Sequence, residues 1–210
     1  MATYLETVSL RAENVGCDRG GLPIVRGVDL ALAPGEAVQL FGANGAGKSS
    51  LLNLFAGHLR VAEGSISWGV DDEWSPGTPA NQIVYIGHEI PVKLALTASE
   101  NLTFWAKTYG VGPSDLKDLV RKALSRVGMI EHADLRAGRL SAGQRRRLDI
   151  ARAGIAKRPV WLMDEPAAAI DEAGEKIVSE LITNHLEHNG IAIIATHDSL
   201  DVVSQRLVIG

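Results

Sequence analysis

The chain has one cysteine, no long block of basic residues and no internal repeat. Cys17 stands alone among 210 residues, so no disulfide can form within the chain, and a reducing compartment is the simpler environment to expect. The longest basic run is Arg145–Arg147, in a chain of formal net charge −4, and we interpret it as a solvated helix face. These features disfavour a nucleic-acid partner.

Long apolar stretches are also missing. No run of about 18 or more apolar residues occurs, and Met1–Glu6 lacks a basic region followed by an apolar run. We therefore expect a chain that neither crosses a membrane nor is exported. With 46% hydrophobic and 22% charged residues, the chain is long enough to bury a sizeable core. We expect one domain over residues 1–210.

A glycine-rich stretch with the spacing G-x-x-x-x-G-K-[ST] is the feature around which the chain is organised. A buried strand is predicted before it, over 37–41, and a helix after it, over 48–56. Glycines let backbone N–H groups turn toward a triphosphate, and the helix start adds the positive end of its dipole. Lys48 would reach the β- and γ-phosphates, and the Ser49 hydroxyl would bind Mg²⁺. The residues of this predicted ATP site are Gly42, Ala43, Asn44, Gly45, Ala46, Gly47, Lys48, Ser49 and Ser50.

Two carboxylates end a short apolar strand predicted over 160–165. Asp164 is a candidate to hold Mg²⁺ through water, and Glu165 to orient or activate an attacking water. By themselves they would equally fit a loop cap, but the glycine-rich loop favours the functional interpretation. His197, after an apolar strand over 191–196, is a candidate contact for the γ-phosphate, although a lone histidine is more often structural.

Leu140–Gln144 places a serine and a glycine at a predicted helix start. Backbone N–H groups and the Ser141 hydroxyl would form a second anion site there. In isolation the same pattern fits an ordinary helix N-cap.

The remaining pattern gives an antiparallel layer followed by helices. Alternating residues predict strands over 8–12, 28–32 and 64–69, and 70–79 is predicted as a loop. Thr97 and Glu100 have capping-box spacing, and Ser114 is a candidate cap for a helix over 115–127. Further elements are predicted as a strand over 82–87, a helix over 173–188, a short helix over 198–204 and a last strand over 206–210.

In this order and spacing, the motifs resemble the nucleotide-binding domain of an ABC transporter over nearly the whole chain. The resemblance implies an α/β fold: a P-loop NTPase with a RecA-like core, an antiparallel β subdomain and an α-helical subdomain at about residues 89–158. It implies an ATPase that uses ATP and Mg²⁺, with Lys48, Glu165 and His197 in catalysis. Leu140–Gln144 corresponds to the family's signature motif and Ala167–Asp171 to its D-loop.

The resemblance also implies partners. Two copies would pack head to tail as a homodimer, with each ATP between residues 42–49 of one copy and Ser141, Gly143 and Gln144 of the other. Integral membrane permease subunits would use the opening of this dimer. The chain would sit peripherally on the cytoplasmic side of the bacterial inner membrane.

Two positions depart from the common family pattern. Arg19 stands where an aromatic residue usually lies under the adenine, and its guanidinium could stack on the base or leave the base loosely held. His88 stands where a glutamine usually ends the strand, and we hypothesise that it takes over the glutamine's contact with magnesium-bound water. Together with Cys17–Gly21 and Leu140–Arg147, these positions are similar to the ABC subunits of cytochrome c biogenesis. That similarity implies haem delivery or export and haem-handling maturation proteins as partners.

Other interpretations remain open. The same motifs would serve another small ABC transporter, a nucleic-acid-associated ABC ATPase or, leaving Leu140–Gln144 unexplained, a small P-loop kinase. A set of apolar residues after His88 would form either a docking groove for a membrane subunit or ordinary core: Ile90, Leu94, Leu96, Phe104, Trp105 and Tyr109.

Overall fold

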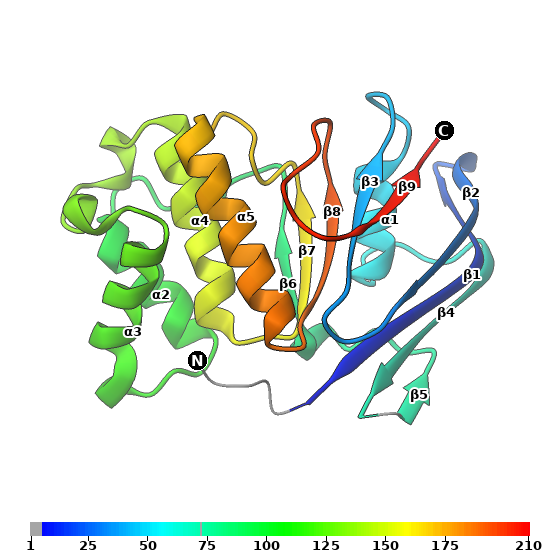
Figure 1. Cartoon of the computed structure of the whole chain (residues 1–210), viewed down its shortest axis with the longest axis horizontal. Coiled ribbons are helices and arrows are strands. Elements are labelled where there is room, and N and C mark those ends of the chain that lie inside the picture. The colour runs from blue at the N-terminus through cyan, green and yellow to red at the C-terminus, as the bar shows by residue number, and fades with distance from the viewer. Residues whose placement is uncertain (1–5, 72) are drawn as a thin grey trace. The chain divides into compact units, whose positions relative to one another are not determined.

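The computed structural model describes residues 6–71 and 73–210; Met1–Leu5, part of the stretch considered above for an export signal, and Asp72 lie outside this description. The chain divides into two compact units, each described here by itself (Figure 1). The first contains the described residues up to Tyr85 together with Arg158–Glu165 and Thr183–Gly210, and the second contains Ile86–Lys157 and Pro166–Ile182. Within the described ranges, no helix is both long enough and apolar enough to span a bilayer.

The first unit contains a four-stranded antiparallel sheet. Its strands are β1 (Val8–Arg19), β2 (Leu22–Leu32), β4 (Glu63–Val70) and β5 (Glu73–Ser75), in the order β2-β1-β4-β5. The β1–β2 hairpin turns at Gly20 and Gly21, whose φ angles of 60° and 80° suit a tight two-residue turn. The prediction of a loop over 70–79 is wrong at β5, which is a short exposed edge strand. Arg11 lies 4.9 Å over the ring of Trp74 on this strand.

A second sheet in the same unit carries the phosphate loop. It consists of β3 (Ala37–Phe41), β6 (Ile83–Ile86), β7 (Val160–Asp164), β8 (Ile191–Ala195) and β9 (Gln205–Val208), in the order β6-β7-β8-β3-β9. The pairs β7/β8, β8/β3 and β3/β9 are parallel. All residues of β3, β7 and β8 are buried, as their continuous apolar runs predict. The carboxyl ends of these three strands therefore meet at one edge of the sheet.

Helix α1 (Lys48–Phe55) follows β3 and buries Leu51, Leu52 and Phe55. These side chains belong to one apolar core with Leu40 of β3 and Trp68 of β4, so a single core supports both sheets of the unit. Outside the sheets, this unit also contains a 3-10 turn, η1 (Ala80–Gln82).

The predicted short helix over 198–204 is wrong. Its backbone is held instead by the buried side chain of Gln39: Gln39 Nε2 donates to the Leu200 carbonyl at 3.1 Å, and Leu200 N donates to Gln39 Oε1 at 2.9 Å. Because these side-chain hydrogen bonds satisfy backbone groups that a helix would pair, the segment leads to β9 without forming a helix.

The second unit is helical. It contains α2 (Ala98–Thr108), α3 (Pro113–Arg126), α4 (Ala142–Ala156), the first part of α5 (Glu172–Glu187) and two 3-10 turns, η2 (Ile130–His132) and η3 (Ala137–Arg139). Leu102, Leu124 and Leu148, from α2, α3 and α4, meet in its apolar core. The Thr97–Glu100 capping box forms as predicted. The predicted Ser114 cap is wrong, because α3 begins two residues before the predicted start, with Pro113 in its first turn and Gly112 as N-cap.

The apolar residues after His88 divide between exposed and half-buried positions. Leu94 and Phe104 are 56% and 42% exposed. Trp105 and Tyr109 are half-buried and stack with ring centroids 5.9 Å apart. Leu94 and Phe104 are therefore the two members of the predicted set that remain most accessible.

Candidate nucleotide-binding site

The loop between β3 and α1 has a backbone that only glycine permits at two positions. Gly42 and Gly47 have φ angles of 153° and 103°. A Cβ at Gly42 would lie 2.3 Å from the Ile209 carbonyl oxygen, and one at Gly47 would lie 2.5 Å from Val25 Cγ2. Val25 on β2 therefore helps to shape the loop, a contribution that the motif spacing alone does not reveal.

Lys48 lies inside this loop. Its side chain is buried, and Nζ donates to the carbonyl oxygens of Gly42 at 2.6 Å and Ala43 at 3.3 Å. Helix α1 begins at Lys48 without a side-chain cap, so N–H groups of its first turn are not satisfied by a capping side chain. A buried ammonium beside an uncapped helix start is a donor set that fits a polyphosphate. Ser49, the next residue, is exposed.

Asp164 and Glu165 stand at the carboxyl end of β7. Asp164 is buried, at 4% exposure. Glu165 adopts a left-handed backbone with φ of 49°, and its N–H donates to the Ala195 carbonyl of β8 at 2.9 Å. Such a conformation is strained for a residue with a side chain and is often found at functional sites. His197, two residues beyond β8, brings Nε2 to 3.3 Å from Glu165 Oε1.

Tyr85 lies near this acidic edge. Burial raises the pKa of its hydroxyl to about 12, and the negative charge of Asp164 adds to the rise. Tyr85 is therefore a neutral neighbour of the carboxylate. Among the described residues there is no group of three or more His, Cys, Asp or Glu side chains that could hold a metal ion. The Ser49 hydroxyl and the Asp164 carboxylate are oxygen donors, the kind of ligand that Mg²⁺ prefers.

The predicted signature motif lies in the helical unit at the start of α4. Ser141 is its N-cap: Gln144 N donates to Ser141 Oγ at 3.1 Å, and Ser141 N donates to Gln144 Oε1 at 2.8 Å. Gln144 Nε2 also lies 2.9 Å from His132 Nε2. At Gly143 a Cβ would lie 2.5 Å from the Ala169 carbonyl oxygen, so glycine lets the helix start approach the segment Ala167–Asp171 closely.

The two departures from the family pattern lie in exposed positions. Arg19 ends β1 at the tip of the hairpin, and His88 follows β6. The residue before His88 is tied to α4, because Arg146 Nη1 donates to the Gly87 carbonyl at 2.7 Å.

The prediction of a solvated face for Arg145–Arg147 is wrong at Arg146, which is buried at 2% exposure. Asp149, also buried, accepts from Arg152 Nε at 3.0 Å and lies 3.7 Å from Arg146 Nη1. Burial raises the pKa of the Asp149 carboxyl, and the positive charges of Arg152 and Arg146 limit the rise. The helical spacing of Arg146, Asp149 and Arg152 is the sequence signal that would have found this network.

Comparison with known proteins agrees with this geometry. The ABC transporter family matches residues 25–168, more than half of the chain. The chain belongs to the ABC transporter family, and it is an ATP-hydrolysing subunit of the ABC type.

Within that family the chain is similar to particular proteins. The cytochrome c biogenesis ATP-binding export protein CcmA of Nitrobacter winogradskyi is 46% identical over 202 residues, which cover 96% of this chain and 98% of that protein. The protein of the same name from Rhodopseudomonas palustris is 43% identical with the same coverage.

Solved structures show the same fold. A putative ABC transporter ATP-binding protein from Pyrococcus furiosus superposes with a TM-score of 0.84 at 24% identity, covering 96% of this chain and 97% of that one. The ATP-binding subunit of another ABC transporter gives 0.76 at 21% identity, covering 90% and 79%. The predicted family and the predicted fold class are confirmed.

Proposed function

We propose that this chain supplies the ATP hydrolysis for an export complex of cytochrome c biogenesis, and that the complex moves or delivers haem. The observation that carries this proposal is the near-complete match, over 96% of the chain, to relatives named as cytochrome c biogenesis ATP-binding export proteins. The names of these relatives supply the pathway. Haem is our inference from the chemistry of cytochrome c maturation.

ATP would bind with its phosphates in the loop Gly42–Ser50, where the buried Lys48 ammonium stabilises negative charge on the β- and γ-phosphates. Ser49 would bind Mg²⁺ directly and Asp164 through water. When bound, this ion neutralises phosphate charge. Glu165 would orient or deprotonate the attacking water, and His197 would contact the γ-phosphate while holding the Glu165 carboxylate in place.

A second copy of the chain would complete the site. We propose head-to-tail packing in which Ser141, Gly143 and Gln144 of one copy close over the ATP bound to residues 42–49 of the other. The exposed start of α4 supports this role, because the positive end of a helix dipole favours an anion even where, as here, Ser141 and Gln144 cap each other. A Glu165→Gln chain held with ATP should elute at twice the monomer mass, and a monomer under saturating ATP, alone or with membrane partners, would contradict the sandwich.

The proposed roles of Arg19 and His88 follow from the family residues whose positions they occupy. Arg19 would stack on the adenine, and His88 would hold a magnesium-bound water in place of the usual glutamine. His88→Ala should lower ATP turnover with little change in ATP affinity. Full activity in this variant would remove His88 from the site.

We place the chain as a peripheral subunit on the cytoplasmic side of the bacterial inner membrane, bound to permease subunits and near haem-handling maturation proteins. We also propose that the two compact units act as one nucleotide-binding domain over residues 1–210, with the helical subdomain at about 89–158.

The test uses the tagged chain in its native membranes. Cytochrome c maturation proteins should co-purify with it, and cells carrying only Glu165→Gln should lose covalent haem staining of their c-type cytochromes. Glu131→Gln, on the exposed η2 turn, is the control and should keep both. Recovery of an unrelated permease with normal cytochromes would refute the pathway, and DNA-stimulated hydrolysis at physiological salt would favour a nucleic-acid-associated role instead.

A further inference from the structure

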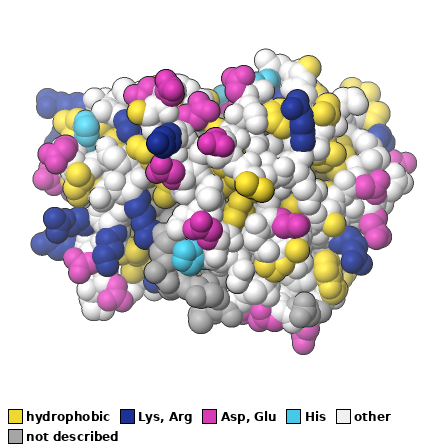
Figure 2. Space-filling view, in the orientation of Figure 1, with side chains coloured by type: hydrophobic (Ala, Val, Ile, Leu, Met, Phe, Trp, Pro, Cys, Tyr) yellow, Lys and Arg dark blue, Asp and Glu magenta, His cyan; other side chains and the backbone are white. Residues whose placement is uncertain are grey.

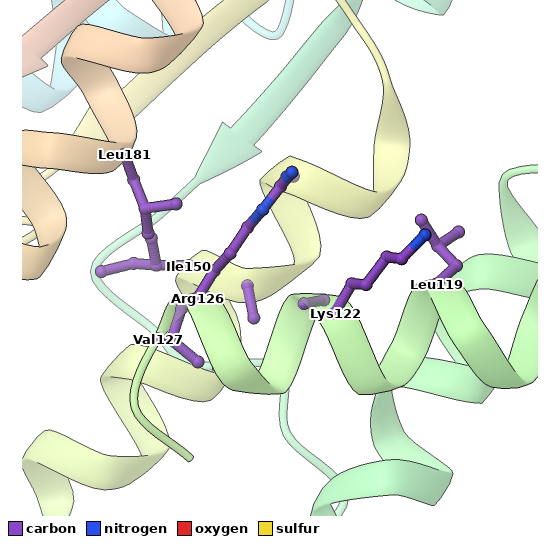
Figure 3. Close-up of a pocket in the computed structure, with 9 residues that line it drawn as sticks. Leu119, Lys122, Arg126, Val127, Ile150 and Leu181 are labelled. Atoms are coloured by element: carbon purple, nitrogen blue, oxygen red, sulfur yellow. The ribbon is translucent and has the colours of Figure 1, made fainter. Parts of the chain in front are cut away.

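The helical unit contains a hollow of about 60 Å³ between α3, α4 and α5. Its walls include Leu119 and Val127 of the α3 region, Ile150 of α4 and Leu181 of α5. Figure 3 shows these apolar side chains around the hollow, with Lys122 and Arg126 extending from α3 beside it. The hollow therefore has an apolar interior and a basic border.

Gly154 leaves this hollow open. It lies within α4, among the residues that line the hollow, and a Cβ added there would meet no atom within 4 Å. Glycine is unfavourable inside a helix relative to alanine, and no close backbone contact requires it here. The chain thus carries a glycine whose structural effect is to leave space between the three helices.

The border carries two positively charged side chains. Lys122 and Arg126 are exposed and four residues apart on α3, so they lie on the same helix face and repel each other. Within residues 6–71 and 73–210, neither takes part in an ion pair. The dipole of α3 accounts for a basic residue in the last turn, but Lys122 lies before that turn. Figure 2 shows Lys and Arg side chains gathered over the region of α3.

A larger, more open hollow of about 570 Å³ adjoins the first, since both are lined by Leu119 and Lys122. Asp115 and Asp118 line the larger hollow. The combined surface therefore changes from acidic to basic along α3, with Leu119 at the join.

We propose that this surface docks a helix of a partner protein that inserts one aliphatic side chain into the hollow beside Gly154 and sets carboxylates against Lys122 and Arg126. The volume suits one aliphatic side chain, and the charges set the direction of the docked helix: its acidic end lies at Lys122 and Arg126, and its basic end at Asp115 and Asp118. None of the residues that line this surface is assigned to the nucleotide site, and the proposal does not depend on the cytochrome c assignment.

The test places a photo-cross-linking amino acid at Ser125, an exposed position on α3 between the two cations, in the full chain within native membranes. After illumination, mass spectrometry identifies the linked segment. A protein segment with an aliphatic residue flanked by Asp or Glu at helical spacing is the expected result. No cross-link, a cross-link to lipid or a linked segment without carboxylates would overturn the proposal.

Two variants make the result specific. Gly154→Leu fills the hollow and should lower the cross-linking yield roughly tenfold or more, as expected for excluding one buried aliphatic side chain, while Gly154→Ala has a smaller effect. Lys122→Glu combined with Arg126→Glu should abolish the link, whereas Lys117→Glu combined with Arg121→Glu, an equal charge change at exposed positions that line neither hollow, should preserve it. Thermal unfolding and basal ATP hydrolysis should match the unmodified chain for all variants. A folded Gly154→Leu chain with unchanged yield would disprove insertion.

Discussion

His197 Nε2 lies 3.3 Å from Glu165 Oε1, and the two residues follow neighbouring parallel strands. Glu165 continues from β7 and also donates its N–H to Ala195, the last residue of β8. Glu165 thus contacts this part of the chain twice. Its backbone N–H bonds to the last residue of β8, and its carboxylate lies against the imidazole of His197, two residues beyond that strand. Movement of His197 would therefore change the direction in which Glu165 presents its carboxylate.

Glu165→Gln should keep ATP binding and remove most ATP hydrolysis. The amide retains the shape of the side chain but cannot accept a proton from water, so we expect a loss of roughly 10²- to 10⁴-fold in turnover. Phosphate release and equilibrium binding of a fluorescent ATP analogue measure the two effects. Glu131→Gln is the control, and substantial turnover in Glu165→Gln would assign water activation elsewhere.

The Glu165–His197 contact predicts that the two residues act as a unit. His197→Ala should lower turnover, and the Glu165→Gln/His197→Ala double variant should be little worse than Glu165→Gln alone, because the histidine acts partly through the carboxylate. Steady-state turnover of the four proteins completes the cycle. If the losses in turnover of the two single variants multiply in the double variant, Glu165 and His197 act independently.

Gly47→Ala should prevent the phosphate loop from forming. The added Cβ would stand 2.5 Å from Val25 Cγ2 in a left-handed backbone, so we expect a loss of about 2 kcal/mol or more in stability and loss of ATP binding. Gly45→Ala is the matched stability control: its φ is 83°, but its Cβ would meet nothing within 4 Å, and it should cost about 1 kcal/mol. Equal losses in urea unfolding would contradict the steric explanation.

Asp149→Ala should destabilise the chain by roughly 3 to 5 kcal/mol, because it leaves the buried guanidiniums of Arg146 and Arg152 without their shared carboxylate. Chemical denaturation measures the loss. Asp134→Ala, at an exposed position, is the control and should stay within about 0.5 kcal/mol of the parent. A small effect for Asp149→Ala would mean that other groups compensate the positive charges of the two arginines.

His185 predicts a pH-dependent loss of stability. Burial lowers the pKa of this imidazole from 6.5 to about 3; its ring stacks on Trp161 with centroids 3.9 Å apart, and Nε2 lies 3.1 Å from the Ile191 carbonyl oxygen. Between these two pKa values the unfolded chain binds a proton that the folded chain excludes. The contribution of His185 to the free energy of unfolding is therefore fully present above pH 6.5. It falls on acidification between the two pKa values, by roughly 1 kcal/mol per pH unit.

The matched comparison for the slope of unfolding free energy against pH is His185→Phe, which keeps a ring beside Trp161 but cannot titrate. Urea unfolding between pH 7 and about pH 4.5 should show a shallower loss for His185→Phe than for the parent or for His188→Phe, whose histidine lies outside the buried stack. Identical slopes in all three would remove His185 as the source.

The sequence by itself determined the parts of this protein that local chemistry dictates. The spacing from Gly42 to Ser49, the Thr97 and Ser141 caps and the apolar runs of β3, β7 and β8 each depend on neighbouring residues, so pattern and propensity suffice to predict the ATP loop, the helix starts and the buried strands. These motifs together also identified the family.

Tertiary structure alone decided what depends on residues far apart in the chain. The strand order placed β8 beside β7, so that His197 meets Glu165. Gln39 binds the backbone near Leu200, where the sequence suggested a helix, and packing of α4 buries Arg146 where the sequence suggested a solvated face. The physical reason is that desolvation and hydrogen bonding depend on which groups meet in space, and a local sequence pattern records only which groups are neighbours along the chain.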